Sequence, residues 1–257
     1  MDAGRDLSRD AKKAQAQVVS YIVSRAPVDT SFGLIASRGA KSEVRLGMPR
    51  EQLAAELAHL LERSDSGSGN DEEGALDAVM EGVGWFGNAL PGDSIVLMSS
   101  EIESNRRTKY AIVAKALADH HIRLFSFLLG PMMMGTVYND MRTDYQGRLS
   151  SSSTVVANQE NLSALTWNSG GYMVVENTEQ PGKEYKLTDA HLDKLRREGW
   201  QMYGAAAEFY RIRLVPVARS VHDKQWTLEL ADSVRSRFPQ AKALYPRELS
   251  FCEAPKP

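Results

Sequence analysis

The fold is decided by residues 93–130, which read DSIVLMSSEIESNRRTKYAIVAKALADHHIRLFSFLLG. This stretch begins with one apolar run, Ser94–Met98, and ends with another, Ile122–Leu129. Two buried strands joined by one helix form a parallel βαβ unit, whose crossover is right-handed. Between the runs, apolar residues recur at three- and four-residue spacing, which predicts a helix with an inner stripe. The stripe consists of Ala111, Val113, Ala114, Ala116 and Leu117.

Polar residues follow the first of these strands at once, over positions 99–105 with the sequence SSEIESN. In open parallel sheets, ligands bind in the crevice outside the carboxyl ends of the strands. The sequence therefore predicts that Ser99 and the residues after it lie at the functional edge of the sheet.

The rest of the chain alternates helical and extended patterns. Helices are expected at 5–25, 51–63, 74–86, 162–167 and, capped by Thr188, 189–207; strands are expected at 32–37, 43–46, 169–175, 209–215 and 226–230. This alternation predicts an α/β fold with a doubly wound, mostly parallel sheet flanked by helices, and a C-terminal helix and β-hairpin extension. The expected organisation is an α/β domain over 1–135, an irregular polar excursion over 136–161, and an extension over 162–257 packed on or beside the sheet.

Composition restricts the classes of partner. The 257 residues are 42% hydrophobic and 25% charged, which is ordinary for a protein with a sizeable core. A formal net charge of -2 gives no electrostatic reason to expect nucleic acid. Cys252 is the only cysteine, so an intrachain disulfide is excluded. The sequence contains neither a bilayer-spanning apolar stretch nor a signal-peptide hydrophobic region at its start, so as written it predicts a soluble chain without membrane insertion and leaves its location unknown.

The order of these elements resembles a von Willebrand factor type A domain, and more closely the bacterial branch called VWFA-related. The segments that carry the resemblance are the Gly-Gly strand at 169–172, the helix at 189–207, the hairpin at 209–230 and Tyr245-Pro246-Arg247. The resemblance implies an integrin I-like fold. It also implies a non-enzymatic role in protein–protein interaction or adhesion, with another protein as the partner.

The resemblance further implies where a metal-ion-dependent adhesion site would lie, and the sequence departs from that site. The family has an Asp-x-Ser-x-Ser loop where this chain has DAGRD at 2–6, so Asp2 fits, Gly4 lacks a hydroxyl and Asp6 replaces the second serine. Gly74 stands at or beside the threonine position, and Ser100 or Ser99 stands at the aspartate position. We therefore expect no cofactor.

If Mg²⁺ or Mn²⁺ does bind, oxygen ligands are required. The residues that could supply them are Asp2, Asp6, Ser100 and Glu101.

A second departure concerns the first strand. In the family a central strand precedes the loop aspartate, whereas here only Met1 precedes Asp2. Without that strand, both of its neighbours would have unpaired backbone groups along one edge. We hypothesise that the chain is a shortened form of a longer protein. Family members carry an export signal upstream of that strand, which would make the protein exported or part of the cell envelope.

The leading functional hypothesis is a metal-independent interaction module that binds another protein at the strand ends. The binding surface would consist of Asp2, Asp6, Asp71, Glu72, Ser99, Ser100, Glu101, Glu103, Arg106 and Arg107. One alternative is a metal-dependent adhesion domain with non-standard ligands. Another is a Ser-dependent α/β hydrolase that uses Ser99 or Ser100, although neither serine lies in a G-x-S-x-G elbow.

Overall fold

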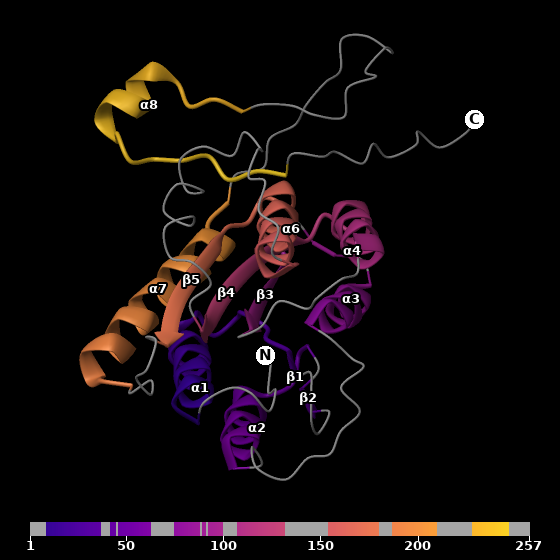
Figure 1. The fold of residues 1–257 in the computed structure, drawn as a ribbon, viewed down its shortest axis with the longest axis vertical. Helices are drawn as coiled ribbons and strands as arrows, with labels where there is room; N and C mark the ends of the chain where they lie inside the picture. The colour runs from indigo at the N-terminus through magenta and orange to yellow at the C-terminus, as the bar shows by residue number, and fades with distance from the viewer. Residues whose placement is uncertain are drawn as a thin grey trace.

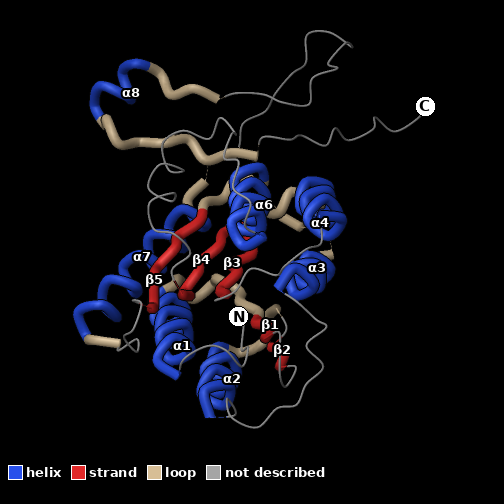
Figure 2. Tube along the Cα trace, viewed as in Figure 1, coloured by secondary structure: helices blue, strands red, loops and turns tan. Residues whose placement is uncertain are grey.

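Three parallel strands form the main sheet of the protein, and helices cover both of its faces (Figure 1, Figure 2). The computed structural model describes residues 9–36, 42–44, 46–62, 75–87, 89–90, 92–99, 107–131, 154–179, 187–209 and 228–246. Within these residues the predicted α/β class is confirmed, because parallel strands alternate with the helices that connect them.

The main sheet has the strand order β3-β4-β5. Its strands are β3 (Ser94–Ser99), β4 (Arg123–Pro131) and β5 (Met173–Glu179). Ser94 lies opposite Arg123 and Ser126 lies opposite Met173, with a register shift between Gly130 and Pro131. Together with the helix α4 (Arg107–Asp119) that connects them, β3 and β4 form the parallel βαβ unit that residues 93–130 predict.

A separate two-stranded sheet is formed by β1 (Leu34–Ala36) and β2 (Ser42–Val44). The two strands are antiparallel, with Leu34 opposite Val44, and both overlap strands that the sequence predicts. Among the described residues, β1 and β3 do not pair with each other, so each is an edge strand. This gap between the two sheets positions the site described below.

Seven helices are described, and those that pack on the main sheet form two layers (Figure 1). They are α1 (Arg9–Arg25), α2 (Arg50–Glu62), α3 (Ala75–Phe86), α4 (Arg107–Asp119), α6 (Thr154–Asn168), α7 (Asp189–Ala207) and α8 (Asp232–Arg237). One layer, α3, α4 and α6, covers one face of the main sheet; the other, α1 and α7, covers the opposite face. None of the described helices is long and apolar enough to cross a lipid bilayer.

The middle strand β4 supplies both layers of the core. Leu124 and Leu128 pack with α3, α4 and α6, whereas Phe125 and Phe127 pack with α1 and α7. A strand that is covered on both faces reads as a nearly continuous apolar run, and β4 does so. The exception, Ser126, is buried and lies 2.9 Å from the hydroxyl of Thr166 on α6.

Helices α1 and α7 approach each other closely at Gly199. A Cβ atom added there would lie 2.4 Å from Cγ1 of Val18, so only glycine permits this contact. The N-terminus of α7 is capped as the sequence predicts: the hydroxyl of Thr188 accepts a hydrogen bond from the backbone N–H of His191 at 3.2 Å. The cap satisfies one of the N–H groups that have no partner within the helix.

Two expectations about the C-terminal half are wrong. Helix α6 begins at Thr154, so the expected irregular excursion over 136–161 includes the first two turns of a helix. The polar residues 158–161 hide the helical period there. Residues 228–230 are not in a strand, and the unexpected helix α8 follows them. The rest of the expected hairpin, 210–227, lies outside the described residues.

Gln15 of α1 gives a prediction about stability. Its side chain is 0% exposed, and neither its amide nitrogen nor its amide oxygen has a hydrogen-bond partner in the described part of the protein. A buried polar group without a partner costs about 1–3 kcal/mol. We therefore expect Gln15→Met to raise the free energy of unfolding by about 1 kcal/mol, measured by urea denaturation.

The matched control for this prediction is Gln17→Met. The side-chain oxygen of Gln17 accepts a hydrogen bond from Arg196 at 2.9 Å, so the same substitution should destabilise the protein. A destabilising Gln15→Met would mean that the amide of Gln15 does have a partner, and the prediction would be wrong.

Candidate functional site

The structure describes little of the binding surface that the sequence predicts. Asp2, Asp6, Asp71, Glu72, Ser100, Glu101, Glu103 and Arg106 lie outside the described residues. Arg107 is described as the first residue of α4. Ser99 is described in full, and its side chain is 0% exposed at the end of β3. The side chain of Ser99 therefore faces the interior and does not contribute to a surface, while the rest of the set stays a prediction.

The four residues considered as metal ligands are all outside the described residues, so the metal prediction is not tested by them. Within the part of the chain that is described, no three His, Cys, Asp or Glu side chains gather in a group that could hold a metal ion.

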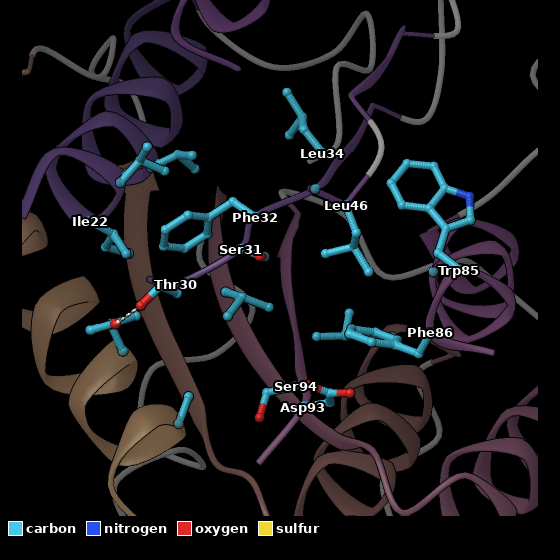
Figure 3. A pocket seen from close by; sticks show the side chains of 18 of the residues that line it. Ile22, Thr30, Ser31, Phe32, Leu34, Leu46, Trp85, Phe86, Asp93 and Ser94 are labelled. Carbon is cyan, nitrogen blue, oxygen red and sulfur yellow. Dashed lines mark hydrogen bonds between the residues drawn. The ribbon is translucent and has the colours of Figure 1, made fainter. Parts of the chain in front are cut away.

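The described residues instead surround a cavity of about 830 Å³ between β1 and β3, which we call the β3 cavity (Figure 3). β3 lines one side of it, and the segment that leads into β1 lines another. Helices α1 and α7 contribute one wall and α3 contributes the opposite wall. Figure 3 shows Ile22 and Phe32 on one side of the cavity and Trp85 and Phe86 on the other.

The strand β3 meets the cavity with its edge. All five residues from Ser94 to Met98 line the cavity. Successive side chains of a strand point to opposite faces, so a strand that met the cavity with one face would contribute every second residue. An unbroken run of lining residues indicates that the backbone edge itself borders the cavity. No described strand pairs with this edge.

The hydrogen bonds to β4 show which backbone groups face the cavity. The N–H of Arg123 donates to the carbonyl of Asp93 at 3.4 Å, so this carbonyl points towards β4. The direction of backbone groups alternates along a strand, and β3 is parallel to β4. The N–H and C=O groups of Ser94, Val96 and Met98 therefore point away from β4 and into the cavity.

The surroundings of this edge are mostly apolar, although Asp29, Thr30 and Asp93 also line the cavity. Val96 is 38% exposed, although its neighbours Leu97 and Met98 are buried. On the α3 side, Gly82 leaves room, since a Cβ atom there would lie 3.3 Å from Cδ1 of Ile95 and 3.7 Å from Cδ1 of Ile35. Side chains of both edge strands thus converge on this glycine from the two sides of the cavity.

The other edge of the main sheet has a different chemistry. β5 ends in the sequence ENTE and contains Glu176, which accepts a hydrogen bond from Lys194 and lies 3.6 Å from His191. The hydrogen bond to Glu176 raises the pKa of Lys194. Charged side chains protect exposed strand edges from pairing with other chains. β3, with the sequence SIVLMS, carries no charge and no proline, and so has the composition of an interior strand.

Arg123 holds together the segments at the end of the β3 cavity where β3 begins. Its guanidinium group donates hydrogen bonds to the carbonyls of Ala205 at 3.2 Å, Ala206 at 2.5 Å and Gly92 at 3.4 Å, and it lies 5.3 Å from the ring centroid of Phe209. Burial lowers the pKa of Arg123, but a guanidinium group stays protonated at neutral pH. Arg123 thereby joins the C-terminus of α7 to the turn before β3.

Arg50 fixes the opposite side of the cavity. Its guanidinium group donates to the carbonyls of Val23 at 3.0 Å, Ala26 at 2.9 Å and Thr30 at 3.2 Å. The hydroxyls of Thr30 and Tyr203 lie 3.1 Å apart (Figure 3). The segment that leads into β1 is therefore tied to α1, α2 and α7, so the width of the cavity is set by specific contacts.

The fold and the cavity together define an α/β protein whose main sheet has one edge, β3, that is uncharged and pairs with no other described strand. The chain is similar to the solved structure of conserved hypothetical protein BatB from Bacteroides thetaiotaomicron, with 16% identity over 79% of this chain and 95% of that chain and a TM-score of 0.47. It is also similar to a von Willebrand factor type A protein from Catenulispora acidiphila, with 12% identity over 75% of this chain and 38% of that chain and a TM-score of 0.44.

A third similar structure is the human COPII-coat protein Sec24c, with 11% identity over 77% of this chain and 31% of that chain and a TM-score of 0.44. No family model matches the sequence, and no curated protein matches it. A von Willebrand A protein is thus among the similar structures, and it belongs to the family that the sequence resembles.

Proposed function

We propose that the protein is a non-catalytic module that binds another protein through the β3 cavity. The observation that supports this function is the backbone edge at Ser94, Val96 and Met98, which no other described strand pairs with and which borders a mostly apolar cavity. Backbone N–H and C=O groups in apolar surroundings require hydrogen-bond partners. A polypeptide supplies such partners together with apolar side chains, and an unpaired edge is a common docking place for one.

The sequence also suggests two alternative functions. The metal-dependent adhesion domain depends on Asp2, Asp6, Ser100 and Glu101, all outside the described residues. The hydrolase would use Ser99 or Ser100 as its nucleophile. A nucleophilic serine must reach its substrate, and the side chain of Ser99 is fully buried. The interaction module is therefore the function that the described residues support best.

Selection of peptides from a random library on the immobilised protein tests this function. We expect the selected peptides to bind at the β3 cavity, so that Val96→Lys weakens their binding at least tenfold. A lysine at the edge of β3 places a charge in an apolar cavity, and charged side chains oppose pairing at strand edges. Fluorescence anisotropy of the labelled peptides gives the dissociation constants.

The matched control is Val28→Lys. Val28 is 96% exposed and does not line the β3 cavity, so the same change of charge there should leave the affinity within twofold. The proposed function would be wrong if no peptide were enriched, or if the two lysine variants bound the selected peptides equally well.

A further inference from the structure

We draw no further inference here: the strongest candidate, the backbone edge of β3 where it borders the β3 cavity, belongs to the site already described, and nothing in the structure shows what covers it.

Discussion

Replacing Gly171 with alanine is expected to lower the free energy of unfolding by about 3 kcal/mol or more, at the upper end of the range for overpacking. Gly171 precedes β5, and a Cβ atom added there would lie 1.8 Å from the carbonyl oxygen of Leu124 and 2.7 Å from its carbonyl carbon. Both atoms belong to the backbone of β4, the middle strand of the main sheet, which is held by hydrogen bonds on both sides.

The clash at Gly171 cannot be relieved by a side-chain rotation, so β4 and β5 would have to separate. Thermal unfolding measures the effect. In a chain of this size, 1 kcal/mol corresponds to roughly 2–4 °C, so we expect the midpoint to fall by roughly 6–12 °C.

The control for Gly171 is Gly84→Ala in α3. A Cβ atom at Gly84 meets nothing within 4 Å, and alanine is favoured over glycine inside a helix, so this variant should be slightly more stable. An unchanged midpoint for Gly171→Ala would mean that the strands are not as close as the structure shows.

The second large effect is expected at Arg123. Arg123→Met keeps the length of the side chain but removes three hydrogen bonds from a guanidinium group to carbonyls, two of them at the C-terminal end of α7. The last carbonyls of a helix have no partner within it, and a cation there is stabilising. We expect a loss of about 2 kcal/mol, because hydrogen bonds to charged groups contribute more than neutral ones.

Two further variants make the Arg123 prediction specific. Arg123→Lys retains the charge but not the planar group that reaches several carbonyls, so its stability should be intermediate. Arg237→Met changes an exposed arginine of α8 and should alter the free energy of unfolding by less than about 0.5 kcal/mol. Urea denaturation of the three variants tests this order, and a loss at Arg237 as large as that at Arg123 would contradict it.

The sequence predicts the regular elements well where apolar residues form a continuous run or recur at helical spacing. β3 and β4 lie within two residues of their expected ends, and α4 contains the predicted apolar stripe. The buried face of α4 is less well predicted. Ala111, expected in the apolar stripe, is exposed, whereas Tyr110 is buried. Alanine is small enough to be accommodated on either face of a helix, so it carries little information about burial.

The candidate site is harder to predict, because it depends on what lies next to a strand. The run Ile95–Met98 predicts a buried strand, and nothing local shows that one side of it has no neighbour among the described residues. Only the resemblance to a family suggested an unpaired edge, because members of that family have a strand before the position of Asp2. The hydrogen bonds of Arg50 and Arg123 could not be predicted from the sequence, because their acceptors are backbone carbonyls of distant segments.

The contact between α1 and α7 has a consequence for synthesis on the ribosome. Gly199 and Val18 meet across more than 170 residues of chain, as do Thr30 and Tyr203. Helix α1 is synthesised first. Its partner α7 is completed roughly 10–40 s later at ordinary elongation rates of about 5–20 residues per second. The half of the core that contains β3, α4 and β4 joins nearer segments and can form earlier. From the synthesis of β4 until α7 is complete, the side of the middle strand that carries Phe125 and Phe127 lacks α7 as cover, so we expect chaperones to bind the nascent chain in that period.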